Sequence, residues 1–411
     1  MLKRFFIAAL LIFYLLSGTL WASSLEIYTP KDKLLTFNKV LPLEGQALGL
    51  NQTTVNRIPI EISSLGNFKC SLLLFPGKNL ALIEGWEGDV VQVKKALRIL
   101  RLISFPDVEK HWARHEIITL ATLGIIEGFP DGNFYPERSL SRGELATWLC
   151  KAQNLKVSYP KSDLFYDVPK EHWRAPYVKA VIEKGYLKPF SKKLFGLEDG
   201  MTRGAVANVI AYAEKLKARE VESAFMDVPK SHPYYKQIEA IKKQRLIKGV
   251  SKKAFIYDPN RNITRAEAVM LLSRFKRLKW LDKWLFNFKE GYISKRYCKV
   301  NTKPRILSAR VSPQTLSLGK ENKLIVEVQV HDFEGLKDIQ SVKIDLTELD
   351  GPPDQDLYDS GRLGDEKEQN GIYTLLYTVD PQDWGEKTFR IYVTDRSGAQ
   401  DSTALSVVIV K

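Results

Sequence analysis

The sequence predicts a multidomain α plus β protein in which a central helical region lies between two β-sandwich domains. Three observations lead to this prediction: the length of the chain, a repeat in its middle, and alternating apolar residues on either side of that repeat. A length of 411 residues accommodates two to four domains of about 100–200 residues each. Apolar residues make up 44% and charged residues 27% of the chain, which excludes wholesale disorder and indicates domains with buried cores.

The first 23 residues have the layout of a secretory signal peptide. Lys3 and Arg4 precede 12 consecutive apolar residues at 5–16, and the stretch Ser-Gly-Thr-Leu-Trp-Ala, which ends in a small residue, follows at 17–22. This apolar run is shorter than the roughly 20 residues that a membrane-spanning helix needs, although an uncleaved N-terminal anchor is the alternative. We therefore expect residues 1–23 to be removed and the protein to be exported.

The middle of the chain contains three copies of one repeat. The pattern Phe-x-Asp-Val occurs three times and places Asp107, Asp167 and Asp227 at intervals of 60 residues. After each copy of this pattern, apolar residues recur three and four positions apart, as at Ile117 and Leu120, which is the spacing of one helix face. Each copy therefore predicts a helix, a loop and a second helix. Because a single helix pair of this size cannot bury its apolar faces alone, the three copies must share a core.

An arginine begins the second expected helix of every repeat. These arginines are Arg142, Arg203 and Arg265. Ser141 with Glu144, and Thr264 with Glu267, have the spacing of a capping box, which explains the residues around the arginine but not the arginine itself. A cation in the first helical turn faces the positive end of the helix dipole. Either an anionic ligand or an internal ion pair with a neighbouring repeat would explain it, and the sequence leaves both open.

The first repeat carries a long motif that is similar to a known family. Residues 124–136 read GIIEGFPDGNFYP, after His111-Trp112 and before Ser-Arg-Gly-Glu. This pattern resembles the S-layer homology domain, and the three copies would be residues 103–162, 163–222 and 223–280. The resemblance implies a pseudo-threefold helical bundle with grooves between the repeats. It also implies that these grooves bind acidic sugars, such as pyruvylated ones, of the cell-wall polysaccharide attached to peptidoglycan.

The resemblance further implies which residues contact the sugar. The arginines would bind its carboxylate, two glycines would let the backbone approach it, and an aspartate and two tryptophans are further candidates, although the tryptophans also fit core positions. The candidate carbohydrate-binding residues are Arg142, Arg203, Arg265, Gly128, Gly249, Asp107, Trp112 and Trp173. Repeat two departs from the pattern, because it has Pro189 at the position of Gly128 and Ala205 at that of the capping glutamate. We therefore expect one groove, using repeat one, to keep a full site.

The segments on either side of the repeats predict β-sandwich domains. Residues 24–102 contain short apolar runs at 41–48, 58–62, 68–75 and 80–83, and residues 304–411 contain runs at 324–330, 342–346, 388–393 and 404–410. The turn at 76–79 is predicted to close a hairpin. With motifs such as Gly66-x-Phe68 and Asp359-x-Gly361, both segments resemble bacterial immunoglobulin-like modules, which would be spacers or surfaces for a protein partner.

Metal and cofactor chemistry has little support in the sequence. The carboxylates of Asp359, Asp365 and Glu366 are a weak calcium candidate, and no other cofactor is expected. Five histidines and three cysteines (Cys70, Cys150 and Cys298) are too few and too scattered for a zinc site or a disulfide framework.

The positive charge of the chain is concentrated behind the third repeat. Residues 241–310 contain 20 Lys and Arg against 4 Asp and Glu, and residues 281–303 are expected to be a basic linker. Aromatic residues such as Trp280 and Trp284 are interleaved with this charge. The combination suits an anionic wall polymer, but it is also typical of a nucleic-acid or membrane-surface patch or of a solvated helix face.

Function is inferred from the modules, because no motif of a catalytic site is present. The sequence contains no nucleophile elbow, no HExxH and no phosphate loop. We expect a non-catalytic, exported protein of the cell wall, S-layer or periplasm that attaches to cell-wall polysaccharide through its repeats. The alternatives are a polyanion, nucleic-acid or membrane-surface binder that uses residues 241–310, and a wall hydrolase with an unrecognised site.

Overall fold

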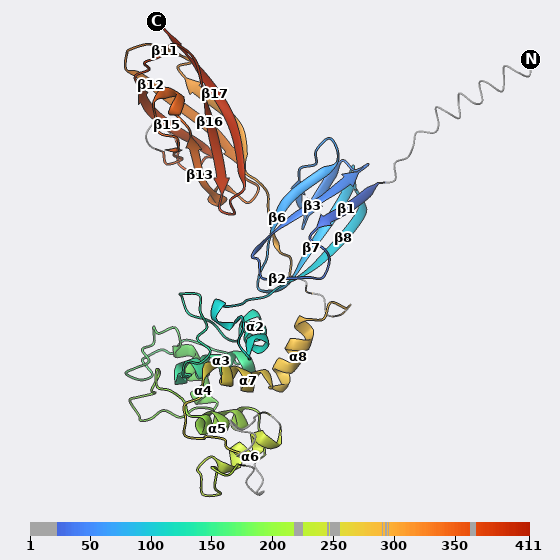
Figure 1. Ribbon diagram of the computed structural model, residues 1–411, viewed down its shortest axis with the longest axis vertical. Helices are drawn as coiled ribbons and strands as arrows, with labels where there is room; N and C mark the ends of the chain where they lie inside the picture. Colours follow the sequence, from blue (N-terminus) through green and yellow to red (C-terminus); the bar gives the residue numbers. More distant parts are fainter. Residues whose placement is uncertain are drawn as a thin grey trace, which may run out of the picture.

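The structure is a computed structural model that describes residues 23–217, 225–244, 246, 255–289, 291, 294, 296–361 and 367–411. It has three regions, which are a β domain near the N-terminus, a helical region, and a β domain at the C-terminus (Figure 1). The order β, α, β along the chain agrees with the fold class that the sequence predicts.

The N-terminal β domain consists of two sheets that enclose one core. One sheet has the strand order β1-β3-β6-β9 and the other has the order β2-β8-β7-β4-β5. Leu43 and Leu72 from the first sheet and Ile83 and Ile99 from the second are fully buried in the shared core. The strands are β1 (Ser24–Thr29), β2 (Leu34–Thr36), β3 (Val40–Leu48), β4 (Gln52–Val55), β5 (Ile58–Ile60), β6 (Asn67–Leu73), β7 (Gly77–Glu87), β8 (Val90–Arg101) and β9 (Lys299–Asn301).

The turn at residues 76–79 does not close a hairpin, so that prediction is wrong. The strands on either side of it, β6 and β7, belong to different sheets, and the chain crosses the sandwich between them. The Asn79 side chain stabilises the main chain of this crossover segment. It accepts a hydrogen bond from the Phe75 amide at 2.9 Å and donates to the carbonyls of Phe75 and Gly77. Gly77 has a φ of 87°, which a residue with a side chain rarely adopts.

The helical region contains the two helices per repeat that the periodicity predicts. The first helices are α2 (Arg114–Thr122), α4 (Ala175–Glu183) and α6 (Tyr235–Lys243), and the second helices are α3 (Arg142–Gln153), α5 (Arg203–Ala213) and α7 (Arg265–Ser273). The second helix of each repeat packs against the first helix of another, in the pairs α3 with α4, α5 with α6, and α7 with α2. One continuous apolar core connects the three repeats.

Backbone hydrogen bonds also connect the three repeats in a cycle. The residue two positions before each arginine donates to its counterpart in another repeat, from Leu140 to Ile263, from Ile263 to Met201, and from Met201 back to Leu140. The three N···O distances are 3.0, 2.9 and 3.0 Å. The N-termini of α3, α5 and α7 therefore lie close together around this ring of hydrogen bonds.

The C-terminal β domain is a second two-sheet sandwich. Its sheets have the orders β10-β12-β15 and β11-β17-β16-β13-β14. Apolar residues of both sheets, such as Val328 and Ile391, form its core. The strands are β10 (Arg305–Ser312), β11 (Thr315–Ser317), β12 (Asn322–His331), β13 (Ile339–Ile344), β14 (Gln355–Leu357), β15 (Ile372–Val379), β16 (Gly385–Asp395) and β17 (Gln400–Val410). Two 3-10 turns are η2 (Leu336–Asp338) and η3 (Thr347–Leu349).

Part of the segment 281–303, which was expected to be a linker, forms secondary structure that packs against the N-terminal sandwich. It includes the end of α8 (Lys276–Leu285) and the strand β9, which pairs with β6 of the N-terminal sandwich. Leu285 packs with Leu100 and Ile118 in a small core between the sandwich and the helical region. The Lys78 ammonium lies 4.3 Å from the centre of the Trp284 ring. Trp284, Phe286 and Phe288 of this stretch therefore pack against the protein, whereas Tyr297 and the preceding Trp280 are exposed.

Candidate functional site

The three repeat arginines lie at the first position of α3, α5 and α7, and all are buried. Arg142, Arg203 and Arg265 expose 7%, 6% and 1% of their surface. In each case the side chain reaches a loop of another repeat, where its Nε donates to a main-chain carbonyl. These bonds run from Arg142 to Phe195 (2.9 Å), from Arg203 to Tyr257 (2.8 Å) and from Arg265 to Phe134 (2.9 Å).

Two of these arginines form ion pairs with a glutamate of another repeat. Arg265 Nη1 lies 2.5 Å from Glu144 Oε1, and Arg203 Nη1 lies 2.7 Å from Glu267 Oε1. The other oxygen of each glutamate accepts the N-cap amide, so the capping boxes predicted at Ser141 and Thr264 are confirmed. The sequence left an internal ion pair and an anionic ligand open for the arginines. The structure shows the internal pair for these two.

Arg142 lacks the equivalent partner. The position that would supply its glutamate is Ala205, and no described carboxylate lies within 4.0 Å of its guanidinium. Its Nη2 donates to the Lys188 carbonyl at 2.7 Å, whereas its Nη1 contacts the Met201 sulfur at 3.8 Å. The Phe190 ring covers the guanidinium, with its centre 4.2 Å from the Arg142 Cζ. Arg142 is therefore a buried cation that makes hydrogen bonds with neutral groups.

Burial lowers the pKa of the Arg142 guanidinium, although the charges of Asp199 and Asp167 oppose this effect. A buried cation without a paired anion is unfavourable, so Arg142 lacks the charge compensation that Arg203 and Arg265 receive from their glutamates. The sequence does contain one sign that Arg142 lacks a carboxylate partner, because Ala205 stands where the other two repeats have a capping glutamate. What the sequence does not show is that this glutamate pairs with an arginine in another repeat.

The aspartates of the Phe-x-Asp-Val pattern organise the loops that receive the arginines. Asp107 accepts hydrogen bonds from the amides of Phe134 and Tyr135. Asp167 and Asp227 bind the corresponding amides, which in repeat two are those of Phe195, Gly196 and Leu197. Although burial raises the pKa of Asp167, these three amides lower it below its ordinary value. Asp107 therefore positions the main chain that binds Arg265.

Of the two glycines expected to let the backbone approach a sugar, the structure describes only Gly128. A Cβ on Gly128 would lie 2.4 Å from the Phe105 ring and 2.7 Å from the Asn133 carbonyl oxygen. Gly128 thus allows close packing within its own loop. Gly249 lies outside the described residues.

The candidate tryptophans are on the surface. Trp112 and Trp173 expose 60% and 48% of their area, so the alternative that they anchor the core is wrong. Each ring lies beside the histidine that precedes it. The Arg174 guanidinium covers Trp173 at 4.4 Å from the ring centre and bonds to Glu198, in the loop that also receives Arg142. Trp173 is thus an exposed aromatic ring in the repeat that receives Arg142.

The weak calcium candidate is only partly described. The Asp359 carboxylate accepts the amides of Asn370 and Gly371 at 3.1 and 2.9 Å, which is a loop-stabilising role. Asp365 and Glu366 lie outside the described residues.

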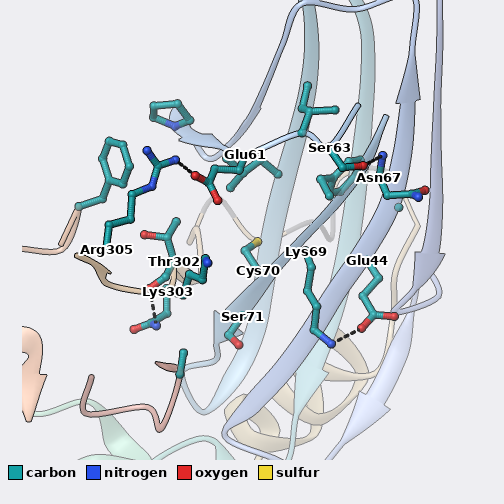
Figure 2. A pocket seen from close by; sticks show the side chains of 18 of the residues that line it. Glu44, Glu61, Ser63, Asn67, Lys69, Cys70, Ser71, Thr302, Lys303 and Arg305 are labelled. Carbon is teal, nitrogen blue, oxygen red and sulfur yellow. Dashed lines mark hydrogen bonds and ion pairs between the residues drawn. The ribbon is translucent and has the colours of Figure 1, made fainter. Parts of the chain in front are cut away.

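A separate cavity of about 910 Å³ lies between the N-terminal sandwich and the segment that leads from it into the C-terminal sandwich (Figure 2). Glu61 and Arg305 form an ion pair across it, and Lys69 pairs with Glu44 at 2.7 Å. Cys70 lines this cavity, but burial raises the pKa of its thiol to about 12. The thiol is therefore protonated at neutral pH and is a poor nucleophile.

Comparison with known proteins identifies the repeats. The family model described as the S-layer homology domain matches residues 104–146, 164–207 and 224–269. The chain contains three S-layer homology domains. On this homology it is an exported cell-surface protein. Among the described residues, no helix has the length and apolar character to cross a membrane.

The curated relatives match the chain over part of its length and over a smaller part of their own. S-layer protein EA1 of Bacillus anthracis is 30% identical over 174 residues, which are 41% of this chain and 20% of the relative. The cellulosome-anchoring protein of Acetivibrio thermocellus is 28% identical over 142 residues, 33% of this chain and 32% of the relative. A protein named as an uncharacterized cell wall amidase of Bacillus anthracis is 28% identical over 174 residues, 42% of this chain and 32% of the relative. The chain thus spans at most about a third of these relatives.

Two solved structures each match about a quarter of the chain. They are the PKD1 domain of Vibrio anguillarum Epp, with 15% identity, and the BIgI domain of the beta protein from S. agalactiae, with 13% identity. The matches cover 26% and 25% of this chain and 95% and 94% of those chains, with TM-scores of 0.16 and 0.17.

Proposed function

We propose that this protein attaches, without catalysis, to the cell-wall polysaccharide linked to peptidoglycan, and that the three S-layer homology domains make the attachment. The names of the relatives include S-layer proteins and a cellulosome-anchoring protein, all of which have a place on the cell surface. The match to the relative named as an amidase covers 32% of it, a share similar to that of the anchoring protein. Because relatives with such different names all match this chain, attachment explains the matched part better than one particular hydrolytic activity does.

The three domains act in this proposal as one pseudo-threefold unit. Support comes from the cycle of hydrogen bonds among Leu140, Met201 and Ile263, and from the packing of α3, α5 and α7 against α4, α6 and α2. A further support is that each arginine binds a carbonyl of another repeat. Removal of one repeat would therefore leave buried polar groups in the other two without partners.

The proposed binding site rests on one observation, which is that Arg142 has no carboxylate partner among the described residues. In the other two positions a glutamate of the protein binds the arginine, whereas repeat two offers Ala205. A carboxylate of an acidic sugar, such as a pyruvylated one, would take the corresponding place against Arg142 Nη1. Guanidinium and carboxylate groups form strong charge-assisted hydrogen bonds. The exposed ring of Trp173 would offer a stacking surface for the sugar.

Arg203 and Arg265 have a supporting role in this proposal. Each would have to release its glutamate in order to bind a ligand carboxylate, and removal of one partner from a buried ion pair is costly. We therefore propose one working groove, between repeats one and two. This agrees with the expectation that one groove, using repeat one, keeps a full site.

The test replaces Arg142 and measures sedimentation of the full chain with purified cell-wall sacculi. Arg142→Gln removes the charge but keeps a hydrogen-bonding side chain, and we expect at least tenfold weaker binding, since a bond to a charged group contributes about 1.5–3 kcal/mol. The matched control is Lys156→Gln, because Lys156 is an exposed cation of the same repeat. Thermal unfolding shows whether each variant is folded.

A second variant separates the loss of a ligand site from the loss of structure. Ala205→Glu keeps Arg142 and adds the carboxylate that the other two repeats have, so it should compete with the sugar and weaken binding. Binding of both variants at the level of the natural chain would contradict the Arg142 site. Equal losses for Arg142→Gln and Lys156→Gln would instead indicate a general effect of positive charge.

A further inference from the structure

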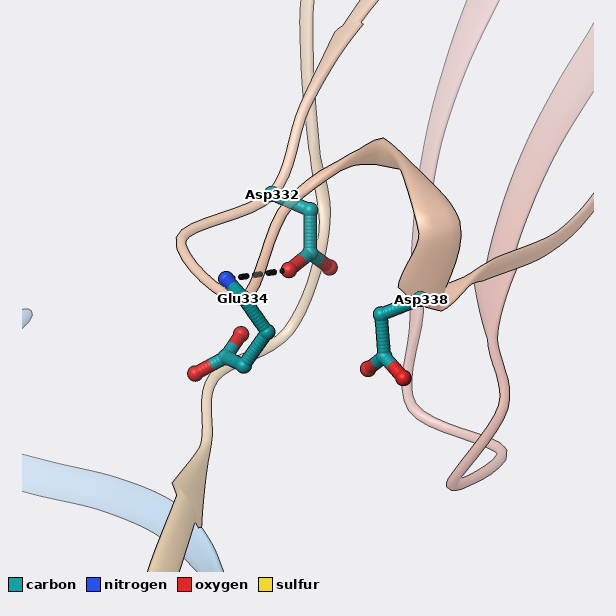
Figure 3. Close-up of side chains that lie close together, drawn as sticks. All are labelled: Asp332, Glu334 and Asp338. Carbon is teal, nitrogen blue, oxygen red and sulfur yellow. Dashed lines mark hydrogen bonds between the residues drawn. The ribbon is translucent and has the colours of Figure 1, made fainter.

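A cluster of carboxylates lies at the base of the C-terminal sandwich, away from the repeats. Asp332 and Glu334 are on the loop that follows β12, and Asp338 is on the short helical turn η2 that comes next (Figure 3). One carboxylate oxygen from each residue lies within 4.8 Å of the other two. Figure 3 shows the three side chains on the same side of this loop.

The cluster contains a buried oxygen that has no partner. Asp332 is 5% exposed, and its Oδ1 accepts a hydrogen bond from the Glu334 amide at 2.7 Å. Its Oδ2 has no hydrogen-bond partner among the described residues, and neither has Asp338 Oδ2. Such an oxygen is costly in a folded protein unless a ligand satisfies it. The described Lys, Arg and His residues form no ion pair with any of the three carboxylates.

The surroundings add to the negative charge. Burial, then the charge of Asp332 and then that of the fully buried Asp395, raises the pKa of Asp338. Arg396 and Lys299 oppose this effect on Asp338 from outside ion-pair distance. Burial, followed by Asp332, raises the pKa of Glu334 to about 7. Because one oxygen of each carboxylate lies within 4.8 Å of the other two, their negative charges repel one another, and a bound cation would relieve this repulsion.

We propose that Asp332, Glu334 and Asp338 bind one Ca²⁺ ion. Calcium takes carboxylate oxygens in flexible geometry with six to eight ligands, and the three carboxylates would be completed by water and main-chain oxygens. Asp332 Oδ2 would be the ligand that the fold leaves without another partner. Calcium sites of extracellular modules have dissociation constants of about 10⁻⁴–10⁻³ M, and we expect that range here.

The ion would act on the junction between the two sandwiches. Glu334 accepts hydrogen bonds from the amide and the hydroxyl of Thr302, each at 3.2 Å. Thr302 directly follows β9, the strand that pairs with β6 of the N-terminal sandwich. Asn301, the last residue of β9, donates to Asp395 at 2.6 Å. A cation bound by Glu334 would therefore hold the end of one sandwich against the start of the other.

The test is a calorimetric titration of CaCl₂ into the chelator-treated full chain. We expect one saturable site per chain in the natural protein and at least tenfold weaker affinity in Asp338→Asn. Asp338 is chosen because no described residue forms a hydrogen bond with its carboxylate, so the variant removes charge with little other change. The control is Asp356→Asn, an exposed carboxylate of the same sandwich that lies 3.9 Å from Lys343, and its affinity should equal that of the natural chain.

Two results would overturn the proposal. One is the absence of saturable calcium binding in the natural chain, which would leave a shared proton as the explanation of the cluster. The other is unchanged affinity in Asp338→Asn, which would place the calcium at different residues. If Asp338→Asn does not fold, as judged by circular dichroism, Glu334→Gln takes its place, because its amide oxygen still accepts a bond from Thr302.

Discussion

At the scale of single residues, one glutamate side chain serves two purposes. Glu144 caps its own helix with one oxygen and pairs with Arg265 with the other. The capping role follows from a spacing of three residues and could be predicted. The pairing could not, because Arg265 is 121 positions away along the chain and the fold alone brings the two together.

Replacement of Glu144 should be strongly destabilising. Glu144→Ala leaves the Arg265 guanidinium buried without its carboxylate and also removes the cap, so we expect a loss of about 3–5 kcal/mol in the free energy of unfolding. Urea titration measures this loss. Glu183→Ala is the control, because the Glu183 side chain is 65% exposed, and it should change stability by less than about 0.5 kcal/mol. A loss below about 1 kcal/mol for Glu144→Ala would contradict the description of the pair.

The three cysteines should be unreactive in the folded protein. Burial raises the pKa of Cys70 and Cys150 to about 12 and that of Cys298 to about 11, and the thiolate is the reactive form. We expect no labelling by iodoacetamide at pH 8 in the native state and labelling of all three thiols in urea, as measured by mass spectrometry. Rapid labelling of any one of them in the native protein would show that its site is open to solvent.

At the scale of elements, the helices of the repeats could be predicted well because their periodicity is local. The turn at residues 76–79 could not, because its residues indicate a change of direction but not which sheet receives the next strand. The apolar pattern also does not indicate the strand β8 (Val90–Arg101), because Lys94 and Lys95 lie in its middle and its outward face is exposed. Strand pairing depends on distant partners, and a single run of residues does not contain that information.

The loop that receives Arg142 depends on Asp167, which gives a prediction about pH. The pKa of Asp167 is lower in the folded protein than its ordinary value of about 3.9. The unfolded chain therefore binds a proton more readily, and the stability that Asp167 contributes is present above pH 4 and lost as the pH falls through the folded pKa. Asp167→Asn should cost about 1–3 kcal/mol at pH 7.

The same variant should also lose less stability than the natural chain between pH 5 and pH 3. Urea unfolding at both pH values measures the difference. An identical pH dependence in the natural chain and in Asp167→Asn would mean that the three amides do not bind the ionised carboxylate.

At the scale of the whole molecule, the segment expected to be a basic linker returns to the first domain. The strand β9 completes a sheet that begins near the N-terminus, and Leu285 packs with Leu100. The charge count indicated a basic stretch but not what its aromatic residues contact. That information lies in contacts between residues roughly 200 positions apart, which composition does not record. The sequence did show the order of the modules, because each module has its own periodicity.

The measurement that tests the central claim most directly is sedimentation of the natural chain with purified sacculi, before and after the polysaccharide is chemically removed. The account predicts that the protein pellets with intact sacculi at 0.15 M salt and stays in solution with stripped sacculi. Pelleting that survives stripping but disappears as salt is raised would indicate nonspecific attraction to polyanions instead. Equal pelleting with both preparations at all salt concentrations, or with neither, would contradict attachment through the polysaccharide.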